Sequence, residues 1–247
     1  MSKGKNSMRD NKHQNAFTLA EVLITLTILG IIAAITIPNL VNTWRKHART
    51  AQLKEAYSLI NQAVKLSIAE NGPVNTWNNL NNNDNQRNLE RDYLAPYLKV
   101  EKIYTFNGKK IWEVKNIRGN VDQTLYSGLL LQNGMRITSN GDTANGIIKL
   151  FVDVNGKQGP DTYGNDVFLF AIVIGDATVD SKWKNSAGQV TTWAGRPNPG
   201  YYTNSTFPDI VDRVKQYCCN SSNCSCCARL IMFNGWKIPD DYPITSF

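Results

Sequence analysis

Histidine is almost absent from this 247-residue chain, whose only two histidines are His13 and His47. Residues 73–247 therefore contain none. This absence excludes a Ser-His-Asp triad, a Cys-His pair and a histidine-ligated metal from that region. The chain also lacks a P-loop, and no spacing of carboxylates or lysines suggests another catalytic centre. The sequence therefore predicts that the protein is not an enzyme.

A concentrated basic charge is also lacking in residues 73–247. The formal net charge of the chain is +7, but residues 73–247 hold 18 basic against 16 acidic residues, so most of the excess lies before them. Proteins that bind nucleic acid carry their basic excess on the folded domain. We therefore do not expect nucleic acid as a partner.

What the chain does have is one long apolar run near its N-terminus. The 21 residues from Phe17 to Ile37 contain no Lys, Arg or Asp and a single acid, Glu21. A helix rises about 1.5 Å per residue, so this run can cross the roughly 30 Å hydrocarbon core of a membrane. A signal-peptide core is shorter, about 7 to 15 residues. A simple anchor leaves Glu21 unexplained, because a carboxylate in a bilayer is costly and the run itself offers it no partner.

The residues around this run resemble the N-terminus of type IV pilins and type II secretion pseudopilins. The shared pattern is a small residue, then Phe-Thr-Leu-x-Glu, then about fifteen apolar residues and a proline, here Ala16, Phe17, Glu21 and Pro38. The resemblance implies that a prepilin peptidase cuts between Ala16 and Phe17, that Phe17 is then N-methylated, and that Glu21 serves assembly. The family usually has glycine where this chain has Ala16.

The same resemblance implies where the protein works. Residues 1–16 would be a leader on an inner-membrane, single-pass precursor with a cytoplasmic N-terminus and its head outside. An inner-membrane assembly platform would then bring it together with other pilin or pseudopilin subunits in an extracytoplasmic filament. The implied function is structural, in a type IV pilus or a secretion pseudopilus. The alternative is a minor tip pilin that binds a surface or ligand, for adhesion or DNA uptake, which an irregular region with Trp183, Trp193, Tyr201 and Tyr202 favours.

After Pro38 the apolar residues become periodic, which predicts a helix with one apolar face. The stripe recurs at spacings of three and four: Leu53, Tyr57, Ile60, Val64 and Ile68. Gly72-Pro73 supplies a left-handed cap and a breaker at its end. We expect one helix over residues 17–72, transmembrane over about 17–40 and amphipathic over about 44–71. It should bend near Gly30 and Pro38.

Residues 73–247 are expected to form one globular, pilin-like head. The asparagine-rich residues 74–92 predict a surface loop that adds nothing to the core and leads to a short helix at about 89–98. The apolar runs that follow predict strands at 102–106, 110–114, 125–132, 135–138, 147–154 and 167–174. Asn107-Gly108 and Asn133-Gly134 lie between the first two pairs of strands and predict two hairpins.

The predicted fold class is α+β. The long N-terminal helix, with a membrane half and an amphipathic half, packs on an antiparallel sheet of about four to six strands. From about residue 175 to the C-terminus, little periodicity remains, which predicts a loop-rich, cysteine-containing region over the sheet.

Oxygen donors gather between the last two predicted strands. Asp153, Asn155, Asp161 and Asp166 lie on a loop with three glycines, and such a loop can hold calcium. Major pseudopilins are similar in carrying a calcium-stabilised loop, although Lys157 excludes an EF-hand. The alternative is a turn-rich connection in which the Asp and Asn side chains bond nearby backbone amides. Calcium is the one cofactor candidate, and both alternatives stay open.

The five cysteines lie within ten residues: Cys218, Cys219, Cys224, Cys226 and Cys227. Beyond an inner membrane the compartment is oxidising, so disulfides are expected, with a zinc site as the alternative. Disulfides between cysteines so close in the sequence would constrain only a local C-terminal segment. The odd number leaves one cysteine as a free thiol or in an intermolecular bridge.

Overall fold

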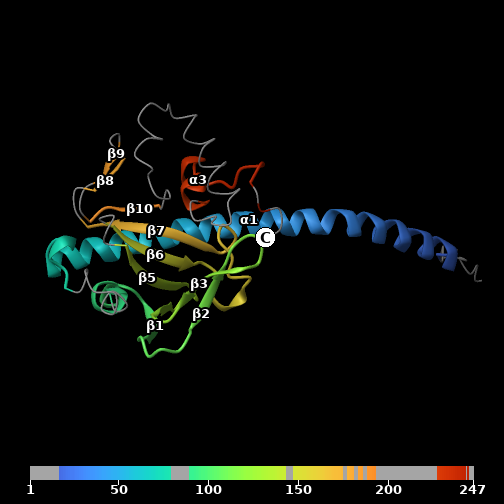
Figure 1. Ribbon diagram of the computed structural model, residues 1–247. Coiled ribbons are helices and arrows are strands. Elements are labelled where there is room, and N and C mark those ends of the chain that lie inside the picture. The colour runs from blue at the N-terminus through green and yellow to red at the C-terminus, as the bar shows by residue number, and fades with distance from the viewer. Residues whose placement is uncertain are drawn as a thin grey trace, which may run out of the picture. The chain divides into compact units, whose positions relative to one another are not determined.

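The computed structural model describes residues 17–78, 89–142, 147–174, 177–180, 183–185, 188–192, 227–242 and 244. The chain divides into two compact units, Met1–Thr43 and Trp44–Phe247. One element belongs to both units, the 53-residue helix α1 (Leu19–Asn71; Figure 1). The predicted long N-terminal helix is thereby confirmed.

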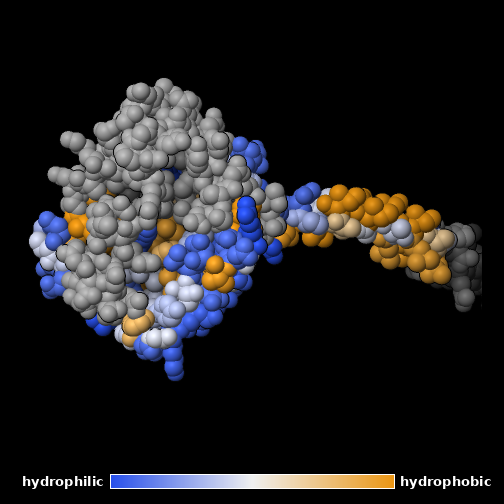
Figure 2. Space-filling model, in the orientation of Figure 1, coloured by the Kyte–Doolittle hydropathy of each residue, from blue (hydrophilic) through white to orange (hydrophobic). Residues whose placement is uncertain are grey.

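In the first unit, α1 carries apolar side chains that nothing covers. Leu19 is 79% exposed and Ile35 is 67% exposed, and Figure 2 shows apolar surface along this part of the helix. By length and composition, α1 is the one helix among the described residues that could cross a membrane. Gly30 and Pro38 lie inside α1, which continues through both residues. The bend expected there stays a prediction.

In the second unit, α1 buries one face. The buried residues include Leu53, Ile60 and Val64 of the predicted stripe, and Tyr57 and Ile68 pack partly buried against the same core. The helix ends where the sequence predicts. Gly72 has a φ of 81°, which favours glycine, and its amide donates to the Ile68 carbonyl at 3.0 Å.

The core sheet has six strands in the order β1-β4-β5-β6-β7-β10, with every neighbouring pair antiparallel. Their bounds are β1 Val100–Tyr104, β4 Gly128–Leu131, β5 Arg136–Asp142, β6 Ile147–Asp153, β7 Val167–Val173 and β10 Val190–Thr192. All seven residues of β7 are buried. Because successive side chains of a strand point to opposite faces, both faces of β7 are covered.

Two smaller hairpins flank this sheet. Strand β2 (Trp112–Lys115) pairs with β3 (Val121–Leu125), and β8 (Ala177–Asp180) pairs with β9 (Trp183–Asn185). Among the described residues of the head, four short helices precede α3 (Cys227–Phe233). They are η1 (Val74–Thr76), the π-helix η3 (Glu90–Leu94), η4 (Ala95–Tyr97) and η6 (Gly156–Gln158).

One predicted hairpin is confirmed and the other is wrong. Strands β4 and β5 meet at Asn133-Gly134 as predicted. Strand β1, however, pairs with β4 and not with β2. Strand β2 turns back into β3 instead, at a turn where the Asn116 side chain accepts backbone N–H groups from Arg118 and Asn120, at 2.9 and 3.1 Å. That Asn side chain makes the turn without an Asn-Gly pair, so the sequence pattern did not reveal it.

The asparagine-rich stretch also differs from expectation. Trp77, predicted to lie in a surface loop, is 4% exposed and belongs to the core. Leu89, at the start of the predicted short helix, is 3% exposed and also belongs to the core, so the stretch does contribute to it. The Trp77 ring stacks on Tyr93 with centroids 4.4 Å apart. Near the C-terminus, α3 was not predicted, yet Cys227, Ala228, Leu230 and Ile231 of α3 are buried. Trp193, Tyr201 and Tyr202 lie outside the described residues.

Candidate functional site

The N-terminal end of α1 is built around Thr18 and Glu21. The backbone N–H and the hydroxyl of Thr18 both donate to Oε2 of Glu21 at 2.8 Å. In return, the Glu21 N–H donates to Oγ1 of Thr18 at 3.2 Å. This reciprocal pattern is a capping box, which satisfies N–H groups that a helix start leaves unpaired.

The capping box corrects one expectation from the sequence. Glu21 was expected to find no partner within its own segment, yet Thr18 binds it. The T-x-x-E spacing at the start of the apolar run is the signal that could have revealed this contact. Both donors are neutral, so within the described residues the negative charge of Glu21 has no paired cation. The capping therefore leaves the charge of Glu21 available to a positive partner beyond the described residues.

The predicted cleavage residues, Ala16 and Phe17, come immediately before this box in the sequence. Phe17 is 86% exposed and precedes α1, whereas Ala16 lies outside the described residues. Cleavage between them, methylation of Phe17 and the assembly role of Glu21 stay predictions.

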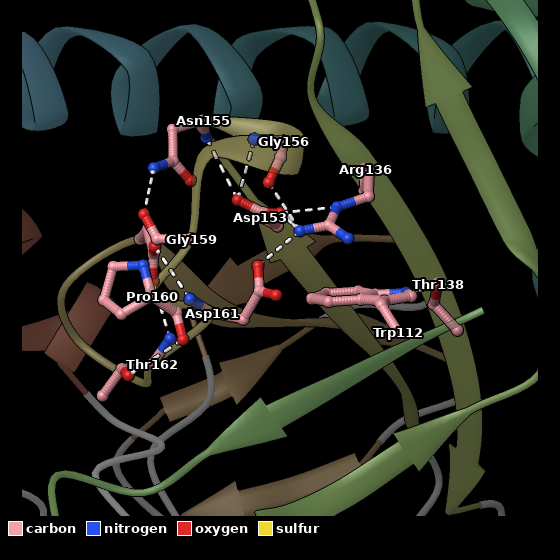
Figure 3. Close-up of polar contacts among 11 residues, drawn as sticks. Trp112, Arg136, Thr138, Asp153, Asn155, Gly156, Gly159, Pro160, Asp161 and Thr162 are labelled. Atoms are coloured by element: carbon pink, nitrogen blue, oxygen red, sulfur yellow. Dashed lines mark hydrogen bonds and ion pairs between the residues drawn. The ribbon is translucent and has the colours of Figure 1, made fainter. Parts of the chain in front are cut away.

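A second constellation lies in the loop between β6 and β7 (Figure 3). One carboxylate oxygen from each of Asp153, Asp161 and Asp166 falls within 4.8 Å of the other two. Asp153 ends β6 and is fully buried, as is Asp166, while Asp161 is half-buried. Three of the four predicted loop residues therefore come together.

Most hydrogen bonds that these carboxylates accept come from backbone N–H groups of the same loop. Oδ1 of Asp153 accepts the backbone N–H groups of Asn155 and Gly156, at 3.1 and 3.0 Å. The Asp166 carboxylate accepts those of Asp161 and Thr162, at 3.0 and 2.7 Å. These are the contacts that the turn-rich alternative predicts. The fourth predicted residue, Asn155, points its side-chain N–H elsewhere, to the Gly159 carbonyl at 3.0 Å. Calcium binding by the loop stays a prediction.

Arg136 is the member of this cluster that sequence reasoning missed. It begins β5 and lies directly opposite Asp153 in the β5–β6 register. Its Nε donates to Asp153 Oδ2 at 2.6 Å, and its Nη2 donates to the Gly156 carbonyl and to Asp161. Its guanidinium lies 4.6 Å from the Trp112 ring centroid. No signal in the sequence indicated this pairing, because the β5–β6 register depends on the number of residues in the turn between the two strands.

A second arginine, Arg49 of α1, interacts electrostatically with the acids of the loop. Burial lowers the pKa of Arg49, while the nearby carboxylates of Asp166 and Asp153 act in the opposite direction. Burial raises the pKa of Asp153 to about 7, with the Arg136 guanidinium opposing it. Burial also raises the pKa of Asp166, against the two backbone N–H groups that it accepts. The opposite charges of the arginine and aspartate side chains thus compensate one another in a largely buried environment.

A small cavity adjoins Arg136. It has a volume of about 230 Å³ and is lined by Tyr104, Trp112, Arg136, Lys157 and four further residues from β4, β5 and the chain between β1 and β2. Pockets for organic ligands usually span about 300 to 1,000 Å³. This cavity is large enough only for a small group.

Of the predicted disulfide residues, Cys227 alone is described. It begins α3 and is buried, close to Gly164. The Tyr242 hydroxyl donates to the Gly164 carbonyl at 2.6 Å, which ties the C-terminal segment to the charged loop. Cys218, Cys219, Cys224 and Cys226 lie outside the described residues. Their disulfides stay a prediction.

Glu90 is a buried acid that the sequence did not single out. It lies in the π-helix η3, is 1% exposed, and accepts a hydrogen bond from the Ser139 hydroxyl of β5. Within the described residues its Oε1 has no hydrogen-bond partner. Burial raises the pKa of Glu90 to about 7, against its usual 4.5, with its hydrogen bonds opposing the shift. This carboxyl therefore keeps its proton to a higher pH than an exposed glutamate does.

We expect Glu90 to make the stability of the head fall as pH rises. Between pH 4.5 and 7 the folded protein binds more protons at Glu90 than the unfolded chain does, so the free energy of unfolding declines through this window. Glutamine does not titrate, so in Glu90→Gln the free energy of unfolding should decline by roughly 3 kcal/mol less over this pH window. The melting temperature Tm of the full-length protein in detergent, measured at pH 5 and pH 8 for both proteins, checks the prediction. An equal change of Tm with pH in both proteins would contradict it.

Comparison with known families agrees with the N-terminal geometry. The prokaryotic N-terminal methylation motif, the signature of type IV pilins and pseudopilins, matches residues 11–37. A second match covers residues 39–245 and is described as a family of unknown function (DUF6613). Because this match spans most of the chain, the protein belongs to that family. No curated protein and no solved structure matches the chain.

The methylation motif indicates the class of protein. It supports a pilin-like or pseudopilin-like chain that is a substrate of N-terminal processing. The motif implies a prepilin peptidase and other pilin subunits as partners, and together with the apolar part of α1 it fits an inner-membrane anchored precursor. The family that carries this motif is structural and not enzymatic.

Proposed function

We propose that this protein is a structural subunit of a type IV pilus-like or pseudopilus filament. Residues 1–16 are its leader, residues 17–72 its assembly helix and residues 73–247 its head. The prepilin peptidase cuts between Ala16 and Phe17, and the assembly platform moves the processed subunit from the inner membrane into the filament. The head acts as a packing unit and not as an enzyme.

One observation carries this proposal: a single acid stands at the start of an otherwise apolar, fully exposed helix half. The exposed side chains, from Leu19 to Leu40, have no cover within the described residues, so they need lipid or other helices around them. Glu21 has hydrogen-bond donors at Thr18 but no paired cation there. Processing would supply one, because a new α-amino group at Phe17 is positively charged below a pKa of about 8.

The head supports the same function. Its buried core runs from α1 through the sheet to α3, so the unit that begins at Trp44 has its own core. The described cavity beside Arg136 is small. The alternative, a minor tip pilin for adhesion or DNA uptake, relies on aromatic residues that lie largely outside the described part of the chain. A main subunit dominates sheared filaments, whereas a tip subunit is scarce, so abundance separates the two.

Cleavage at Ala16 tests the proposal directly. Ala16→Leu puts a bulky side chain where the peptidase needs a small one and should block leader removal, while Ala16→Gly should be cut at least as fast as the wild type. Each precursor is expressed with the matching peptidase, and the N-terminal peptide of the product is identified by mass spectrometry. A mature N-terminus elsewhere than Phe17, or unimpaired cleavage of Ala16→Leu, would contradict the proposal.

A further inference from the structure

Three buried or half-buried carboxylates meet in the β6–β7 loop, and their mutual repulsion requires a compensating cation. Calcium is a poor fit for the oxygens that the loop offers. Calcium takes about six to eight oxygen ligands, yet five of the six carboxylate oxygens already accept hydrogen bonds. The Asn155 side chain bonds to the Gly159 carbonyl through its N–H group. Its buried Oδ1 has no hydrogen-bond partner among the described residues and adds only one oxygen. We propose that the guanidinium of Arg136 takes the place of a bound metal ion in this loop.

Arg136 binds the kinds of group that a calcium ion would bind. It contacts one carboxylate at the start of the loop, Asp153, a second in its middle, Asp161, and the backbone carbonyl of Gly156. Carboxylates and backbone carbonyls are the usual calcium ligands in proteins. A guanidinium is always charged and donates along fixed directions, so it can join these groups as a metal ion does.

Two further features hold the arginine in place. The Trp112 ring lies against the guanidinium, with the carbon at its centre 4.6 Å from the ring centroid, in a cation–π contact. The Trp112 Nε1 in turn donates to the Thr138 hydroxyl at 3.2 Å, which fixes the ring beside β5 (Figure 3). The Arg136 side chain is only 13% exposed, so its charge is largely removed from competition with water.

A second arginine, Arg49 of α1, also acts on two of these acids. The charges of Asp166 and Asp153 raise the pKa of Arg49 against the effect of burial. Asp153 and Asp166 are therefore subject to the charge of Arg49 in addition to the compensation that Arg136 gives. This arrangement leaves little charge for a metal ion to neutralise. The inference concerns the stability of the head and does not depend on a role in a filament.

The stability of the protein should therefore be indifferent to calcium and dependent on Arg136. For the full-length protein in detergent at pH 7.5, Tm should differ by less than about 1 °C between millimolar calcium and chelator. Arg136→Gln should lower Tm by more than about 5 °C, because it leaves buried carboxylates uncompensated. Lys157→Gln makes the same charge change on the same loop and should leave Tm within about 1 °C.

The pairing of charges, and not only the shape of the arginine, is tested by Asp161→Asn in the Arg136→Gln background. Removing one of the unpaired acids should raise Tm above that of Arg136→Gln, which also keeps the test usable if the single variant folds poorly. A double variant that melts no higher would overturn the proposal. So would a wild-type Tm that rises with calcium and loses this rise in Asp161→Asn, or an Arg136→Gln protein as stable as Lys157→Gln.

Discussion

Glu21→Ala should give a stable, membrane-bound and normally cleaved protein that is at least roughly 100-fold depleted from filaments. The α-amino group of a processed Phe17 is positively charged. In a growing filament it can meet the carboxylate of a neighbouring subunit in a setting of low dielectric. Loss of one partner of such a buried pair costs about 3 to 5 kcal/mol, and each 1.4 kcal/mol is about a tenfold change in the equilibrium. Leader removal by gel shift and subunit content after shearing measure the two steps separately.

Thr18→Val is the matched control, because Glu21→Ala also removes the capping box at the start of α1. Thr18→Val deletes the capping hydroxyl but keeps the acid, and losing a cap costs about 1 kcal/mol. Its filament content should stay within about tenfold of the wild type. If the two variants are equally depleted, the helix cap and not charge pairing is the role of Glu21. If Glu21→Ala subunits assemble as the wild type does, the pairing mechanism is wrong.

Gly156→Ala should be among the most destabilising single-methyl changes in the head. A Cβ at Gly156 would lie 2.1 Å from the carbonyl oxygen of Gly134, in the β4–β5 turn, and Gly156 has a φ of +67°. Neither backbone can yield without moving the strands that carry it. We expect a loss of more than about 3 kcal/mol and a fall in Tm of about 10 °C. Thermal unfolding of the full-length protein in detergent measures the change.

Gly108→Ala separates the overlap from the backbone conformation. Gly108 also has a positive φ, of +76°, but a Cβ there would meet nothing within 4 Å. Only conformational strain of about 1 to 2 kcal/mol remains. Equal Tm values for the two alanine variants would show that the contact between the β6–β7 loop and the β4–β5 turn is loose, contrary to our prediction.

The elements that the sequence predicted correctly are those with local signals. The stripe from Leu53 to Val64 predicts a helix face by its period, Gly72 predicts the end of that helix, and the apolar runs predict β6 and β7. The partner of β1 could not be predicted in this way, because strand pairing depends on contacts that are distant in the sequence. The stacking of Trp77 on Tyr93 could not be predicted either. Both residues lie in a polar stretch, and the burial of a single aromatic residue produces no periodic pattern in the sequence.

The candidate sites divide along the same line. Ala16, Phe17 and Glu21 form a contiguous motif, so their roles could be proposed from the sequence. The acids of the β6–β7 loop were also visible. Their cation was not, because Arg136 precedes Asp153 by a whole hairpin and Arg49 belongs to α1. The residues of the loop left open whether calcium or local hydrogen bonds stabilise it. They gave no indication that an arginine distant in the sequence forms ion pairs with its acids.

The continuity of α1 means that two units share one element. The helix runs through the unit boundary after Thr43 without a break. Before that boundary its apolar side chains are exposed, and after it Leu53 and Ile60 have no exposed surface. One helical backbone therefore carries both an uncovered apolar surface and the buried face of the head's core.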